Sequence, residues 1–207
     1  MSRVTSLSLY VTAFLVGGVL MGFEMLGSRY LFPYFGSGIG TWAGLISTVL
    51  IALTLGYFFG GQIVDRIPSP RFIATAIAIA AGYLSLVPAT ADKALMCILN
   101  SVGEGPLGIM VAASGLLLIP LSLLGTLSPV CVRLLTRTTS ESGRVSGLIY
   151  GISTVGNVFG TLFTTFALIP TFGSRRITYF FAGILALCSV ILFLSPKPLA
   201  SLAVKPE

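Results

Sequence analysis

Six long apolar runs, almost free of charged residues, constrain this 207-residue chain more than any other feature. A helix needs about 20 apolar residues to cross the hydrocarbon core of a bilayer. Only 9% of the residues are charged, whereas soluble domains carry about 25%. The sequence therefore predicts an all-α integral membrane protein, a single domain whose six transmembrane helices lie near Ser6–Leu31, Gly40–Val64, Phe72–Pro88, Leu107–Leu127, Val145–Ile169 and Ile177–Leu194.

The segment Lys93–Gly105, between the third and fourth runs, is harder to place. Its apolar part, Ala94–Leu99, is too short to span a bilayer. The cluster from Gly103 to Pro106 is expected to break a helix. We therefore predict an interfacial helix or a folded loop for this segment.

The basic residues predict the orientation of the chain, because cytoplasmic loops carry an excess of Lys and Arg. With a cytoplasmic N-terminus, Arg29, Lys93, Arg175 and Arg176 lie outside, and the other eight basic residues lie inside. Both termini are therefore expected in the cytoplasm, with the protein in a cytoplasmic membrane of bacterial type. The inside residues are Arg3, Arg66, Arg71, Arg133, Arg137, Arg144, Lys197 and Lys205.

Several function classes are disfavoured by what the sequence lacks. There is no histidine, which excludes His-ligated haem, His-containing zinc sites and His general-base catalysis. Cys97, Cys131 and Cys188 show no CxxC spacing, and no span carries paired carboxylates. The basic residues are scattered and form no stripe that would follow a nucleic acid. We expect no catalytic residue, no enzymatic activity, no metal, no cofactor and no nucleic-acid partner.

Glu24 is the one acidic residue inside an apolar run, which it shares with Arg29. A charge at that depth is costly and marks a polar pathway or a contact between helices. Glu24 could bind a cationic substrate, relay a proton or bond a neighbouring helix, for example at Asn157. A structural contact with Arg29 is the simpler alternative, since two long side chains can meet across five residues. The candidate substrate-binding residues are Glu24, Arg29 and Asn157.

Glycines spaced four residues apart predict close helix contacts in the second and fifth spans. Asn157 lies among those of the fifth span and is interpreted as a hydrogen-bonding group between helices or as a substrate contact. The motif P-x-F-G-S occurs at Pro33–Ser37 and at Pro170–Ser174, but this pair joins the first span to the fifth, so we infer no repeat from it. The glycines are Gly56, Gly60, Gly147, Gly151, Gly156 and Gly160.

The inner end of the second span contains Gly61-x-x-x-Asp65-Arg66. This pattern resembles the signature between the second and third helices of the major facilitator superfamily, where the loop acts as a conformational latch. The resemblance makes Gly61, Asp65 and Arg66 candidate latch residues. The basic residues usual after Asp-Arg are replaced here by Ile67–Arg71, and an ordinary charged loop explains the pattern equally well.

Read together, motifs between Glu24 and Gly173 resemble the membrane half of the fused major-facilitator/spermidine synthase proteins. The resemblance implies six helices arranged like one half of a major facilitator fold. We expect no synthase domain, because the sequence ends soon after Lys197 and has no Gly-rich nucleotide-binding loop. The matching residues are Glu24, Arg29, Pro33, Phe35, Gly36, Trp42, Gly56, Tyr57, Gly60, Gly61, Asp65, Arg66, Ser128, Pro129, Arg133, Leu134, Leu135, Gly147, Tyr150, Thr154, Gly156, Asn157, Gly160, Pro170 and Gly173.

Two functions follow as hypotheses. The first is a transporter-like half unit for a small solute, which could be a polyamine-type cation recognised by Glu24. Six helices supply one wall of such a site, so we expect a homodimer or a second membrane chain. The second is a non-transporting membrane subunit that anchors or assists a spermidine synthase-like enzyme or a larger membrane complex.

Overall fold

The computed structural model describes residues 3–66, 69–136 and 138–194, and this part of the chain is helical with short connections and no strand. The elements run as α1 (Arg3–Phe35), α2 (Ile39–Arg66), α3 (Pro70–Val102), α4 (Pro106–Ala113), η1 (Ser114–Leu118), α5 (Ile119–Gly125), α6 (Leu127–Leu135), η2 (Thr139–Glu141), α7 (Ser142–Phe163), η3 (Thr164–Leu168), α8 (Ile169–Thr171) and α9 (Ser174–Leu194).

These elements form six segments that are long and apolar enough to cross a membrane, counted over the described residues. The predicted fold class, an all-α membrane protein with six such helices, is confirmed. In hydrocarbon every backbone N–H and C=O must be bonded within the protein, which explains why such runs fold as helices. The spans are Ser6–Phe35, Ile39–Arg66, Pro70–Val102, Pro106–Leu135, Thr139–Thr171 and Ser174–Leu194.

The third helix differs from its prediction. α3 continues through Pro88 to Val102, so the folded loop that was one alternative for Lys93–Gly105 was wrong, and residues 93–102 are the last part of α3. The helix begins at Pro70, where the Ser69 side chain accepts a hydrogen bond from the Arg71 amide at 3.3 Å. It ends at Gly103, whose φ of 88° is a conformation that L side chains rarely adopt.

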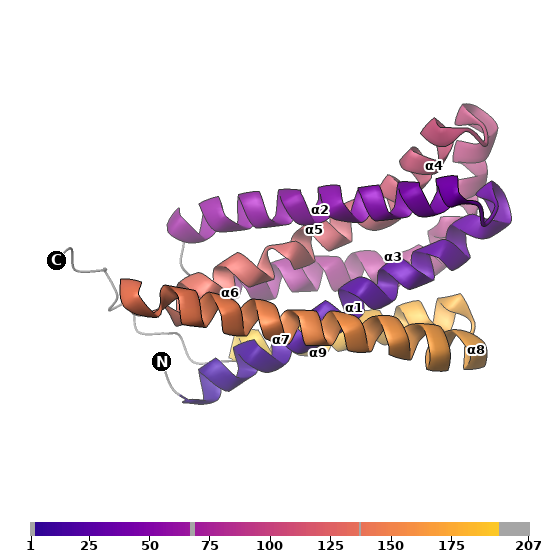
Figure 1. The fold of residues 1–207 in the computed structure, drawn as a ribbon. Helices are drawn as coiled ribbons and strands as arrows, with labels where there is room; N and C mark the ends of the chain where they lie inside the picture. The colour runs from indigo at the N-terminus through magenta and orange to yellow at the C-terminus, as the bar shows by residue number, and fades with distance from the viewer. Residues whose placement is uncertain (1–2, 67–68, 137, 195–207) are drawn as a thin grey trace.

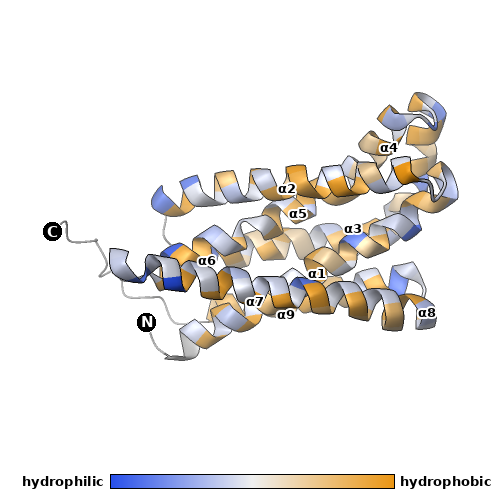
Figure 2. Cartoon of the chain, viewed as in Figure 1, coloured by the Kyte–Doolittle hydropathy of each residue, from blue (hydrophilic) through white to orange (hydrophobic). Residues whose placement is uncertain are grey.

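Successive spans alternate in direction, so α1 begins and α9 ends at the same end of the bundle (Figure 1). We call this the basic end, because Arg66, Arg71 and Arg144 lie there with the end of α2 and the starts of α3 and α7. The opposite end is called the α1–α2 hairpin end. The most hydrophilic residues lie mainly toward the two ends, whereas apolar residues cover the length of the helices (Figure 2).

The principal contacts between spans follow a three-plus-three pattern. The first span packs most extensively on the fifth, and the second packs on the fourth. The first span also contacts the sixth, and the third contacts the fourth. The third and sixth spans pack on each other. If the first span is exchanged with the fourth, the second with the fifth and the third with the sixth, this set of contacts stays the same. An odd number of spans in each half makes the two halves inverted relative to each other.

Large apolar side chains also point outward, notably from α2, α7 and α9. Examples are Phe58 on α2, Phe166 in the fifth span and Leu187 on α9, which are 61%, 76% and 58% exposed. A water-soluble monomer rarely exposes apolar surface on this scale. Lipid chains are the natural solvent for such a surface, in agreement with the length of the helices.

Candidate functional site

Glu24 lies on α1, about 16 Å along the helix from its end at Phe35. The residue is buried, with 7% of its surface exposed. Within the described ranges, neither a hydrogen bond nor an ion pair engages its carboxylate. A charged or strongly polar group is thus held inside the bundle without compensation from a neighbouring side chain.

Contacts of two glycines on α1 identify the helices around this depth. A Cβ placed on Gly27 would meet the side chains of Leu45 on α2 and Leu117 in η1, each at 3.4 Å. A Cβ placed on Gly22 would meet Thr164 Oγ1, at the start of η3, at 2.6 Å. The same Cβ on Gly22 would lie 2.8 Å from the Phe181 ring of α9, so the second, fourth, fifth and sixth spans all pack on α1 within about one turn of Glu24.

Thr48 on α2 lies at about the same depth as Glu24. α1 and α2 are antiparallel, and Gly27 of α1 faces Leu45 of α2. Glu24 lies three residues before Gly27 and Thr48 lies three residues after Leu45, so both steps lead to the same level of the bundle. The Thr48 side chain is 1% exposed, and its Oγ1 has no hydrogen-bond partner. Two polar groups without partners thus occupy one level of the bundle, where buried polar groups normally are bonded.

Two π-helical segments flank the same level. η1 (Ser114–Leu118) and η3 (Thr164–Leu168) are each followed by an Ile-Pro pair, ending in Pro120 and Pro170. Proline lacks an amide hydrogen and its ring clashes with the carbonyl four residues earlier, so a widened turn before it relieves the clash. Such π-helical turns are frequent at functional sites. Here they alter the backbone of the fourth and fifth spans beside Glu24.

The structure does not bring the three predicted substrate-binding residues together. Arg29 is exposed at the hairpin end and makes no ion pair with Glu24. In the amide orientation that satisfies its neighbours, the Asn157 nitrogen donates to the Gly17 carbonyl at 2.8 Å and to the Ser153 carbonyl at 3.2 Å. Asn157 therefore joins α7 to α1, and Glu24 remains alone.

The three candidate latch residues lie at the basic end. Asp65 forms an ion pair with Arg133 of α6, with 3.5 Å between Oδ1 and Nε. The Asp65 side chain is 72% exposed, so this contact lies at the surface. A Cβ on Gly61 would meet nothing within 4 Å, and Arg66 is exposed. The close helix approach in this part of α2 is made by the neighbouring glycine, Gly60.

Four of the six predicted packing glycines lie at helix crossings. A Cβ on Gly60 would lie 2.8 Å from Thr126 Cα, and one on Gly56 would lie 2.9 Å from Gly125 Cα. On α7, Gly156 and Gly160 pack against the backbone of Phe14 and Gly18 of α1, respectively. Gly147 and Gly151 face open space instead, so the first G-x-x-x-G step of α7 makes no crossing with the described helices.

A pocket of about 630 Å³ at the hairpin end, lined in part by charged residues, was not predicted. We call it the arginine pocket. Asp92 of α3 is central to it, because its Oδ2 accepts a hydrogen bond from Arg175 Nη2 at 2.6 Å and its Oδ1 accepts one from the Tyr34 hydroxyl at 3.4 Å. The pair Arg175-Arg176 at the start of the sixth span was the available signal in the sequence. The pocket is lined by Arg29, Tyr30, Pro33, Tyr34, Asp92, Gly173, Ser174, Arg175 and Arg176.

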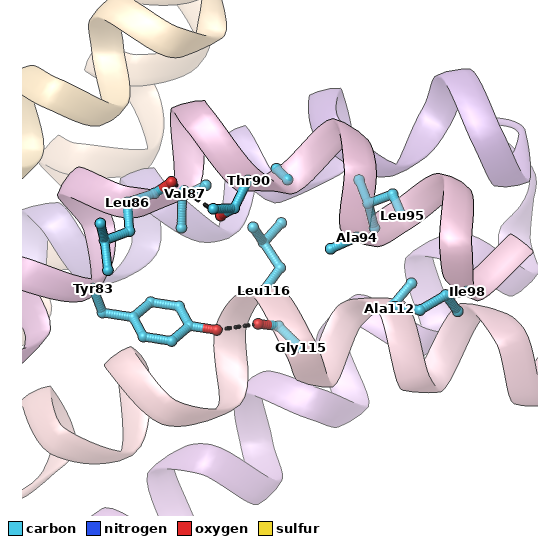
Figure 3. Close-up of a pocket in the computed structure, with 11 residues that line it drawn as sticks. Tyr83, Leu86, Val87, Thr90, Ala94, Leu95, Ile98, Ala112, Gly115 and Leu116 are labelled. Atoms are coloured by element: carbon cyan, nitrogen blue, oxygen red, sulfur yellow. Dashed lines mark hydrogen bonds between the residues drawn. The ribbon is translucent and has the colours of Figure 1, made fainter.

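A second pocket, of about 210 Å³, lies between α3 and the fourth span and is mostly apolar (Figure 3). Leu86, Leu95 and Leu116 are among the side chains that line it. The Tyr83 hydroxyl donates a hydrogen bond to the Gly115 carbonyl, within η1. Tyr83 therefore satisfies a backbone group of the widened turn, and the pocket offers few polar groups to a ligand.

The described residues contain no group of three or more His, Cys, Asp or Glu side chains that could hold a metal ion. Cys131 and Cys188 are buried and Cys97 is exposed, and all three are free thiols. No protein-family model, curated protein or solved structure matches the chain.

Proposed function

We propose that this protein is a transporter-like half unit for a small cationic solute, of which a polyamine is one example, with Glu24 as the recognition group. One observation carries the proposal: Glu24 is buried in the bundle with no described side chain or backbone group bonded to it. An isolated carboxylate in a membrane span is costly and usually marks a substrate or ion path. A bound cation supplies the missing charge, and the Thr48 hydroxyl supplies a further oxygen at the same depth.

The paired contacts of the spans support the half-unit part of the proposal. Inverted three-helix repeats occur in transporter folds, where the substrate site lies near the midplane between two larger halves. Six helices supply one such half. We therefore propose that the working unit is a homodimer or a complex with a second membrane chain. The apolar surface of α7, with Phe159 and Phe163 stacked at 5.3 Å between ring centroids, is compatible with a partner helix or with lipid.

The test is flux of radiolabelled spermidine or putrescine into proteoliposomes that contain the purified protein. Glu24→Gln is expected to lower flux at least about tenfold, because it removes the negative charge that offsets the cation. Glu104→Gln is the matched control, since it neutralises an exposed carboxylate outside the helices. Unchanged flux in Glu24→Gln, with normal flux in the control, would contradict the proposal.

The alternative is a non-transporting membrane subunit that anchors or assists a spermidine synthase-like enzyme or a larger complex. Arg66, Arg71 and Arg144 favour it, because they are exposed at the basic end and form no ion pair with any described acidic residue. They offer a docking surface to an acidic partner. Co-purification with a soluble partner in mild detergent, lost when these three arginines are changed to glutamate, is the expected result. Solute flux by the purified protein alone would exclude this alternative.

A further inference from the structure

We infer that the arginine pocket binds a phosphate group, supplied either by a lipid headgroup or by a free phosphate compound. The inference does not depend on Glu24 or on transport. Its basis is that three arginine residues from two separate segments line one pocket of about 630 Å³. Arg29 comes from α1, whereas Arg175 and Arg176 come from the start of α9.

The charges that line the pocket do not balance. The lining includes three arginine residues and one acidic residue, Asp92, so its formal charge is +2. Both oxygens of Asp92 are already engaged, one by Arg175 and the other by the Tyr34 hydroxyl. Arg29 and Arg176 have no acidic partner among the described residues. An anion that enters the pocket therefore meets two guanidinium groups without having to break an existing ion pair.

The pocket is also braced across three helices. Asp92 and Arg175 join α3 to α9, and the Tyr30 hydroxyl is 2.9 Å from Thr178 Oγ1, which joins α1 to α9. These contacts hold the ends of the three helices together around the pocket, which limits the reorganisation that ligand binding requires. Arg175 is held by Asp92, so Arg29 and Arg176 are the groups left to contact the ligand.

Phosphate is the ligand that suits this arrangement best. A guanidinium group donates paired hydrogen bonds to a phosphate, and several arginines together match its multiple oxygens. α9 also begins at Ser174 within the pocket lining, and the start of a helix carries partial positive charge. The pocket lies where α1 ends and α9 begins, and Tyr residues at such positions commonly mark the level of lipid headgroups.

The test uses the full-length protein, purified in a neutral detergent. One arm titrates inorganic phosphate by calorimetry. The other reconstitutes the protein in nanodiscs of phosphatidylcholine with increasing phosphatidylglycerol and counts retained lipids by native mass spectrometry. The variants are Arg29→Gln/Arg176→Gln and the charge-preserving Arg29→Lys/Arg176→Lys. The control is Lys93→Gln, which neutralises an exposed basic residue of α3 that does not line the pocket.

The Gln double variant is expected to weaken binding at least about tenfold, the Lys variant to weaken it less, and the control to bind like the wild type. Saturable binding in the first arm identifies a free phosphate compound as the source, and retention in the second arm alone identifies the lipid headgroup. Equal loss in the control, or binding that persists unchanged in the Gln variant, would overturn the inference. Absence of binding in both arms would also overturn it. Thermal unfolding of each variant verifies that the fold is retained.

Discussion

Residues 24 and 29 show how a helix separates two charges that are close in sequence. Five residues turn a helix by about 500°, so the two side chains point about 140° apart. Glu24 faces the packed interior, while Arg29 is exposed near the end of α1 and reaches the arginine pocket. The predicted contact between them fails for this geometric reason, and the carboxylate is left without a partner.

Glu24→Leu is therefore expected to stabilise the protein. Removing a buried polar group that lacks a partner eliminates its desolvation penalty, about 1–3 kcal/mol. Thermal unfolding in detergent, monitored by size-exclusion chromatography, measures the change. Glu104→Leu should shift stability by less than about 0.5 kcal/mol, because Glu104 is exposed. A large loss of stability in Glu24→Leu would show that the carboxylate has compensation inside the bundle.

At the scale of the helix, the G-x-x-x-G steps that make crossings lie in the second and fifth spans. Gly56 and Gly60 of α2 pack on the fourth span, and Gly156 and Gly160 of α7 pack on the first. These spans are equivalent in the three-plus-three pattern of contacts, so the sequence did contain a signal of that pattern. P-x-F-G-S did not reveal it, because it marks the exits of two spans that are not equivalent.

Gly60→Ala and Gly61→Ala provide a sharp comparison of neighbouring positions. The added methyl group at residue 60 meets the backbone of Thr126 at 2.8 Å, so the second and fourth spans must move apart. We expect a loss of about 1–3 kcal/mol for Gly60→Ala, the usual cost of overpacking, and little change for Gly61→Ala. Thermal unfolding in the same detergent gives both values. Equal effects at the two positions would contradict the observed crossing.

α3 shows why hydropathy misplaced a boundary. The expected end at Pro88 lies shortly before Asp92 and Lys93, which interrupt the apolar run. The helix itself is about 50 Å long, longer than a hydrocarbon core about 30 Å thick. Charged residues mark where a helix leaves the lipid. The helix itself ends later, where Gly103 adopts a positive φ. The end of the apolar run and the end of the helix therefore need not coincide.

For the whole molecule, the expected orientation can be tested at Cys97. This thiol is exposed on α3 near the hairpin end, whereas Cys131 and Cys188 are buried. If the basic end faces the cytoplasm, a membrane-impermeant maleimide should label the wild type in intact cells and leave Cys97→Ser unlabelled. Mass spectrometry of the labelled protein identifies the site. Labelling only after permeabilisation would reverse the orientation.

Composition and periodicity were sufficient to predict the fold class, because long uncharged runs have few stable alternatives to transmembrane helices. They also marked Glu24 as unusual, since its cost depends only on its position within an apolar run. Other features depend on how helices distant in sequence rotate and cross. These are the lack of a partner for Glu24, the depth that Glu24 shares with Thr48, and the position of Arg29 and Arg176 at one pocket. Those relations arise from side-chain packing between helices, and local sequence does not specify them.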